Sequence, residues 1–143
     1  MKNWLWWALS LLMLSSPLSR GAVITWTNSS GGSWTNAANW SPNQVPGSSD
    51  TASITNGTGY TVNLDTTVTI AGLTLGGSSG TQTLVTASTL TVGSAVINPS
   101  GVLQFEGGSV NASSPVMVNG VLNWNGGQLN GSLTVSSNAL MRL

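Results

Sequence analysis

Beyond residue 50, short apolar runs alternate with polar breaks along the chain, and this pattern predicts β-strands. Each run is two to five residues long, and Gly-Gly, Ser-Gly, Asn-Gly and Asn-Pro pairs separate the runs. No apolar stripe with helical spacing occurs after the N-terminal segment. The predicted strands are Ala52–Ile54, Tyr60–Leu64, Val68–Ile70, Leu73–Leu75, Leu84–Val85, Leu90–Val92, Val96–Ile97, Val102–Phe105, Val116–Val118, Val121–Trp124 and Leu133–Val135.

Two stretches repeat each other at an offset of nineteen residues. Gly101–Ser113 and Gly120–Ser132 share seven of thirteen residues, and the other six positions keep their class, with Phe105 replaced by Trp124. A third copy starts at the same offset, with Asn138, Met141 and Leu143 in the positions of Asn119, Leu122 and Trp124. Self-similarity over about 20 residues is typical of a solenoid, in which each repeat forms one coil stacked on the last.

The sequence therefore predicts an all-β fold, a right-handed parallel β-helix whose coils stack about 4.8 Å apart. Residues one repeat apart then lie over each other. The predicted inward ladders are Leu103/Leu122/Met141, Phe105/Trp124/Leu143 and Val110/Leu129. The competing fold is an antiparallel β-sandwich, which also has short strands and turns but does not require a register of nineteen residues.

Other repeated positions predict the corners and the outer surface of the coils. Glycine pairs at corners supply positive φ, and asparagines one repeat apart can form amide ladders. The pairs are Gly107-Gly108 and Gly126-Gly127 for the corners, and Asn111/Asn130 and Asn119/Asn138 for the ladders. Val102, Val121 and Leu140 alternate out of phase with the inward set, so they face either solvent or a second layer.

The segment 22–50 differs from the rest and predicts an N-terminal cap, followed by solenoid coils over 51–143. It holds Trp26, Trp34 and Trp40 among turn-rich stretches, which predicts an aromatic cluster that closes the first coil. The residues from Ala139 onward begin a further coil without a polar capping segment. The expectation is a fragment of a longer protein or a partner at that end.

The residues 1–21 predict a signal-peptide helix that is removed. Lys2 is the positive segment, Trp4–Leu14 is an apolar run of eleven residues, and Ser19 and Gly21 place small residues before the cleavage site. A transmembrane anchor is the alternative. Eleven residues span only about 16 Å as a helix, against a hydrocarbon core of roughly 30 Å. The prediction is therefore export to the periplasm, the cell surface or the medium.

The composition excludes several classes of partner. The chain has 143 residues, enough for one modest domain, and only 4% of them are charged. Without the signal segment, Arg142 stands against Asp50, Asp65 and Glu106. This balance argues against nucleic acid and anionic membranes, which need clustered Lys or Arg. The chain has no Cys and no His. Disulfides and thiolate chemistry are thus excluded, and no cofactor is predicted.

A family resemblance rests on Trp26–Ile54, which reads W-T-N-S-S-G-G-S-W-T-N-A-A-N-W-S-P-N-Q-V-P-G-S-S-D-T-A-S-I. This segment, with Tyr60–Gly77 and the repeats, resembles the autotransporter-associated β-strand-repeat proteins and related PEP-CTERM-type exported bacterial proteins. The resemblance implies a β-solenoid surface or secreted protein, often a passenger or stalk. The chain departs from that group because it lacks an outer-membrane barrel and a C-terminal sorting signal.

The sequence offers three kinds of candidate site, and none is a convincing catalytic or metal centre. Asp65 and Glu106 lie about two coils apart, roughly 10 Å on one face, as a candidate acid pair, while Asp50 is a candidate turn cap. Calcium β-rolls need an Asp after Gly-Gly turns, and none follows here. Trp26, Trp34 and Trp40 could stack on sugar rings if they were exposed. Cap packing is the simpler interpretation.

The leading hypothesis is a non-enzymatic, exported structural or adhesive β-solenoid segment. Its expected partners are extracellular glycans or proteins, with no nucleic acid, no stable membrane insertion, and end-to-end self-association of the open coils. One alternative is a carbohydrate-binding module that uses the Trp-rich region. Another is the N-terminal fragment of a polysaccharide-degrading β-helix enzyme.

Overall fold

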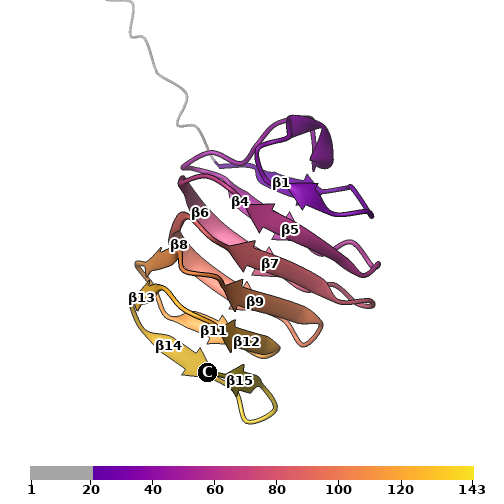
Figure 1. Ribbon diagram of the computed structural model, residues 1–143. Coiled ribbons are helices and arrows are strands. Elements are labelled where there is room, and N and C mark those ends of the chain that lie inside the picture. Colours follow the sequence, from indigo (N-terminus) through magenta and orange to yellow (C-terminus); the bar gives the residue numbers. More distant parts are fainter. Residues whose placement is uncertain (1–20) are drawn as a thin grey trace, which may run out of the picture.

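The computed structural model describes residues 21–143, which wind into a stack of β-strand coils (Figure 1). The strands of successive coils pair in parallel, so the fold is an all-β parallel β-solenoid, as predicted. The predicted signal-peptide helix lies outside the described residues. Within residues 21–143, no helix is long and apolar enough to span a bilayer.

Two sheets carry all fifteen strands, and one short 3₁₀ helix, η1 (Ala37–Asn39), lies in the N-terminal segment. One sheet, called sheet A here, holds β1 (Val23–Trp26), β3 (Trp40–Ser41), β4 (Thr51–Ile54), β6 (Val68–Leu75), β8 (Thr89–Ile97), β10 (Ser109–Ala112), β11 (Val116–Val118), β13 (Gln128–Asn130) and β14 (Leu133–Val135). The other, sheet B, holds β2 (Gly32–Ser33), β5 (Tyr60–Leu64), β7 (Gln82–Thr86), β9 (Gly101–Phe105), β12 (Val121–Trp124) and β15 (Leu140–Arg142).

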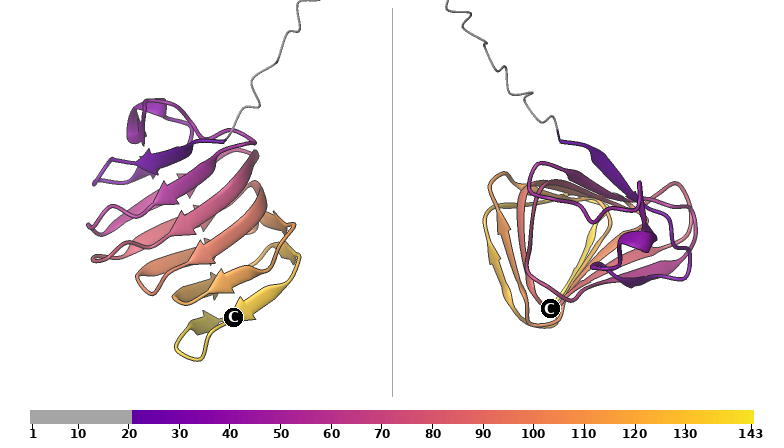
Figure 2. Two further views of the ribbon diagram at one scale, coloured as in Figure 1. Left: turned by 180° about the vertical axis from the view of Figure 1, so that it is seen from behind. Right: turned by 90° about the horizontal axis from the view of Figure 1, so that it is seen from above.

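Sheet A bends, which lets two sheets enclose the core on three sides. In β6 and β8 the parallel register is continuous except at Ala71 and Gly93, which are left unpaired at the bend. After β8 the two halves separate, because β10 pairs with the first half of β8 and β11 with the second. Seen along the axis, the coils superimpose into one closed outline (Figure 2).

Alternation along each strand sends every second side chain into this enclosed core. β5 shows the pattern clearly, with Tyr60, Val62 and Leu64 buried and Thr61 and Asn63 exposed. Each inward residue lies over its equivalent in the next coil because the strands pair in register. The remaining fully buried large side chains are Trp26, Trp34, Trp40, Phe105, Ile24, Ile54, Ile70, Leu75, Leu84, Leu90 and Ile97.

Most of the predicted ladders are confirmed. Strand pairing aligns Leu103, Leu122 and Met141 in one column and Val110 with Leu129 in another. The rings of Phe105 and Trp124 stack with centroids 5.2 Å apart and planes inclined by 17°. The predicted continuation of this aromatic ladder to Leu143 is wrong. Leu143 follows the end of β15 and is 93% exposed, since no later strand holds it against Trp124.

The three residues whose direction the sequence left open, Val102, Val121 and Leu140, share a register and point outward. Val102 and Val121 are half-buried and Leu140 is exposed, so neighbours in the same column shield them partly. No second layer covers them within the described residues.

Glycine allows the tight corner that follows β12. Gly127 has φ of 86°, and a Cβ there would overlap the carbonyl oxygen of Gly108 in the coil before. Gly107 likewise has φ of 93°. The prediction of positive φ is thus confirmed at these corners, although Gly108 itself is not among the positive-φ glycines.

Candidate functional site

The three tryptophans of the cap (residues 22–50) form one buried cluster. Trp26 and Trp34 are 0% exposed and Trp40 is 1% exposed. Trp40 packs edge to face against both partners, with centroids 4.9 Å from Trp26 and 4.8 Å from Trp34. Trp26 also stacks on Tyr60 of β5 at 6.3 Å. The cluster therefore joins the cap to the first complete coil.

Local hydrogen bonds fix the cluster in place. The indole N–H of Trp26 donates to the carbonyl of Asn28 at 2.7 Å, and that of Trp40 donates to the carbonyl of Trp34 at 2.8 Å. The buried Asn39 side chain donates to the Ser33 carbonyl at 3.0 Å. By contrast, the buried indole N–H of Trp34 has no partner among the described residues.

The cap also closes the edge of sheet A. β3 pairs antiparallel with β1, with Trp26 opposite Trp40, whereas every other strand pair of the described chain is parallel. This reversal lets a short strand cover the backbone groups that β1 would otherwise expose. Because no tryptophan ring face of the cap reaches solvent, the geometry favours cap packing over sugar stacking for Trp26, Trp34 and Trp40.

Of the three acids, Asp50 holds a turn before β4. Its carboxylate accepts the backbone N–H of Ala22 at 2.8 Å and that of Gly47 at 2.9 Å. These contacts confirm the expected turn cap. Asp50 precedes a strand of sheet A, whereas Asp65 and Glu106 follow strands of sheet B, so the structure does not gather the three acids.

Asp65 and Glu106 each follow the C-terminal end of a strand of sheet B. These strands lie two apart in the sheet, because the residues before the two acids both pair with Thr86 of β7. This spacing corresponds to about 10 Å, as expected from the sequence. Each carboxylate has its own partners. Asp65 accepts the hydroxyl of Ser33. Glu106 accepts the side-chain amides of Gln104 at 2.6 Å and Asn125 at 2.7 Å.

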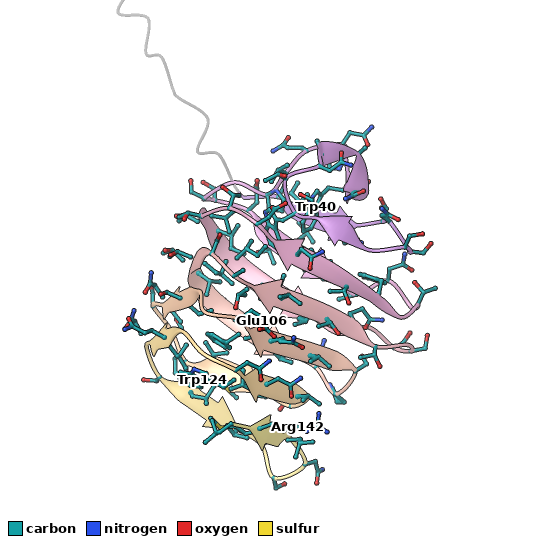
Figure 3. The ribbon with its side chains drawn as sticks, in the orientation of Figure 1. Trp40, Glu106, Trp124 and Arg142 are labelled. Atoms are coloured by element: carbon teal, nitrogen blue, oxygen red, sulfur yellow. The ribbon has the colours of Figure 1, made fainter. Side chains whose placement is uncertain are left out.

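The Asn125 amide, followed by that of Gln104, lowers the pKa of the Glu106 carboxyl below its ordinary value of 4.5. The hydrogen bonds favour the ionised form, since both partners donate to it. Figure 3 shows Glu106 in the middle coils, between Trp40 at the capped end and Trp124 and Arg142 in the last coils.

Outward columns of mostly polar residues run across both sheets. On sheet A, Thr69, Thr91, Asn111 and Asn130 occupy one column in register. The amide of Asn130 donates to that of Asn111 at 2.8 Å, which confirms this predicted amide ladder. On sheet B, a second column is formed by Asn63, Val85, Gln104, Asn123 and Arg142.

A buried glutamine, Gln82 of β7, is a structural position that sequence reasoning did not single out. It is 0% exposed, and its amide N–H groups donate to the carbonyls of Thr58 and Ser79 at 2.5 and 3.0 Å. Its oxygen accepts the N–H of Gly77 at 2.6 Å. Gln82 therefore ties two successive corner loops to the core. The only sequence signal was a polar residue at an inward position of an alternating run.

The last coil forms an open end. β13, β14 and β15 each pair on one side only, and the inward Met141 of β15 is 38% exposed. Val135 and Leu140 are 41% and 44% exposed. Arg142 is the only charged residue on these three strands, so little charge protects their edges from pairing with another strand.

Over residues 21–143, no group of three metal-ligating side chains comes together, and no pocket opens on the surface. In comparisons with known proteins, no family model matches the chain, and neither a curated protein nor a solved structure is significantly similar to it.

Proposed function

We propose that this chain is an exported, non-enzymatic β-solenoid segment with a structural or adhesive role. The observation that carries the proposal is the closed cap followed by coils that stack in register. A stack of this kind is stiff, because each coil is bonded along its length to its neighbours. Export and adhesion remain to be tested separately.

The proposed adhesive surface is the outer face of sheet B. It presents Asp65, Glu106 and Arg142, three of the four charged residues of the described chain, beside a column of amide side chains. Amides and carboxylates supply the hydrogen bonds that bind sugar hydroxyls or the backbone of a protein partner. An extracellular glycan or protein on this face fits better than one on the buried tryptophans.

A glycan array and a panel of surface proteins, probed with residues 22–143, test the adhesive role. We expect Asn63→Arg combined with Gln104→Arg to abolish binding without changing the melting temperature. Thr69→Arg on the outer face of sheet A is the matched control. Binding that survives the sheet B variant, or a lack of any ligand, contradicts the adhesive role.

Export is tested through the N-terminal segment. We expect expression of the full chain in a bacterial host to give an exported product that begins at Ala22, as read by N-terminal sequencing. Leu11→Arg should block export because it interrupts the apolar run, whereas Leu11→Ile should preserve it. Retention of both variants and of the parent chain inside the cell contradicts the proposal.

Self-association is proposed at the open end. At the capped end, β3 covers the edge of sheet A. Two copies would therefore meet at their open ends, through β13, β14 and β15 of each copy. We expect concentration-dependent dimerisation of residues 22–143 in sedimentation velocity. Met141→Lys should abolish it, while Thr61→Lys on an outward position of β5 should not. A monomer at every concentration contradicts this part.

A further inference from the structure

Four Asn-Gly pairs occur in the described residues: Asn56-Gly57, Asn119-Gly120, Asn125-Gly126 and Asn130-Gly131. In this dipeptide the nitrogen of the glycine can attack the side-chain carbonyl of the asparagine, because glycine has no side chain to obstruct the approach. The reaction needs a glycine N–H without a partner and room for the backbone to move. None of the four glycine N–H groups has a backbone acceptor in the described chain, so the four sites differ in the room around the glycine.

Asn125-Gly126 has the most space around its glycine among the four pairs. Asn125 is exposed at the corner after β12, and a Cβ placed on Gly126 would meet no atom closer than 3.7 Å. No backbone carbonyl of the described chain accepts the N–H of Gly126. The Asn125 backbone is held by one bond, from its own N–H to the Phe105 carbonyl at 3.1 Å.

The remaining pairs are more confined. Gly120 is buried, and a Cβ there would overlap the carbonyl oxygens of Asn98 and Gly101. A Cβ on Gly57 or Gly131 would lie 2.8 Å from Ser79 or Ala112 atoms of the neighbouring coil. Asn119 is also held by its N–H, which donates to the Ile97 carbonyl at 2.7 Å. Attack at Asn119-Gly120 therefore requires local opening of the coil, because Gly120 is buried against backbone of the coil before.

We propose that Asn125 is a site of spontaneous self-modification in the folded protein. The backbone nitrogen of Gly126 loses its proton to water and bonds to Cγ of Asn125. The bond from Cγ to the side-chain nitrogen breaks, and ammonia is released. The product is a five-membered succinimide. Water then opens the ring at either carbonyl, which gives aspartate or isoaspartate. No oxidation or reduction takes place.

The product acts against Glu106. In the unmodified chain the Asn125 amide donates to the Glu106 carboxylate at 2.7 Å across one rung. The new carboxylate has no N–H to donate and carries a negative charge. Like charges directly opposite each other on neighbouring strands are destabilising. The modification therefore replaces an attractive contact by a repulsive one and loosens the last coils.

Site selectivity is tested by ageing residues 22–143 in isotopically labelled water at mildly alkaline pH, followed by peptide mapping. We expect heavy oxygen to enter at Asn125 first and at Asn119 at least about tenfold more slowly, since Asn119 needs local opening. In denaturant all four sites should react at similar rates, because they share the dipeptide. Equal rates at Asn119 and Asn125 in the folded protein overturn the proposal.

The consequence is tested with defined variants. We expect Asn125→Asp to lower the melting temperature at neutral pH, and Glu106→Gln added to it to restore most of the loss. Asn130→Asp is the matched control, because its partner Asn111 is uncharged, so its effect should be smaller and independent of Glu106. If Asn125→Asp lowers the melting temperature as much in the Glu106→Gln background as in the parent chain, the proposed repulsion with Glu106 is wrong.

Discussion

The two ends of the solenoid use aromatic residues in opposite ways. At the capped end, Trp26, Trp34 and Trp40 are completely enclosed, and Trp40 lies less than 5 Å in centroid distance from each of the other two. At the open end, Trp124 stacks on Phe105 on one side and is only half-buried. The same residue type is thus fully enclosed at one end and covered on one side at the other.

This difference shows what stabilises a stack of coils. An inward side chain gains burial from its own coil and from the coils before and after it. Met141 aligns with Leu122 exactly as Leu122 aligns with Leu103, yet Met141 is 38% exposed and Leu122 is 1% exposed. Register alone therefore does not bury a residue; the next layer does.

The largest expected effect is on the cap. Trp40→Ala should lower the free energy of unfolding by about 3–5 kcal/mol, because it removes a buried ring that contacts two others. Trp124→Ala, the same substitution at the open end, should cost about 1–2 kcal/mol, since less buried area is lost. Urea unfolding of both variants of residues 22–143 measures the difference. Equal losses contradict the comparison between the ends.

A smaller effect is expected in the coils between the two ends. Gln82→Leu keeps the approximate size of the side chain but leaves two carbonyls and the Gly77 N–H without their partner. The expected loss is about 2–3 kcal/mol in urea unfolding. Gln104→Leu on the neighbouring strand is the control. It is half-buried on the outer face and should change stability little.

Gln82 also marks the limit of what the sequence predicted. The nineteen-residue offset was visible because Gly101–Ser113 and Gly120–Ser132 keep class at each position, and these strands do pair at that offset. Earlier coils are longer. Tyr60 pairs with Gln82, twenty-two residues later, and the three extra residues lie in a corner loop. A buried glutamine opposite a tyrosine gave no recognisable repeat.

The strands were mostly predicted, but the prediction missed β1, β2, β3, β10, β13 and β15. β5, β11, β12 and β14 have the predicted bounds. β6 and β8 each join two predicted runs, because the small residues at the bend between the halves stay in the strand. β10 and β13 were not predicted as strands, since each has a single apolar residue among polar ones; the pairing across coils makes them strands.

The candidate site was predicted less fully than the fold. The sequence placed Trp26, Trp34 and Trp40 in a cap, but it left their exposure open, because that depends on how β3 turns back on β1. Ser33, the partner of Asp65, and Asn125, one partner of Glu106, come from other coils. They could be found only once the length of each coil was known.

A third prediction concerns the core beneath the cap. Burial raises the pKa of the Tyr60 phenol above its ordinary value of 10.0, and the nearby Asn56 backbone offsets part of the rise. The contact between the Tyr60 hydroxyl and this backbone falls short of a hydrogen bond. Because this pKa is raised in the folded chain, the contribution of the protonated Tyr60 phenol to stability is complete below pH 10. It is lost as the pH rises through the pKa of the folded chain.

Tyr60 is the only tyrosine of the chain, so phenolate absorbance reads this residue alone. We expect the folded chain to titrate at higher pH than the urea-unfolded chain. Trp40→Ala should move the folded titration towards the unfolded one, because it opens the cluster that covers Tyr60. A folded titration that coincides with the unfolded one contradicts the closed cap.

The smallest expected effect lies at the exposed carboxylate of Glu106. Its pKa is lowered chiefly by Asn125, so its contribution to stability is present above the ordinary value of 4.5 and is lost as the pH falls through the lowered value. Glu106→Gln should therefore melt slightly below the parent chain at neutral pH and together with it in acid. The difference should be small and should shrink in salt, because the group is exposed to water. Thermal melts across this pH range measure it. A gap that widens on acidification contradicts the hydrogen bonds assigned to Glu106.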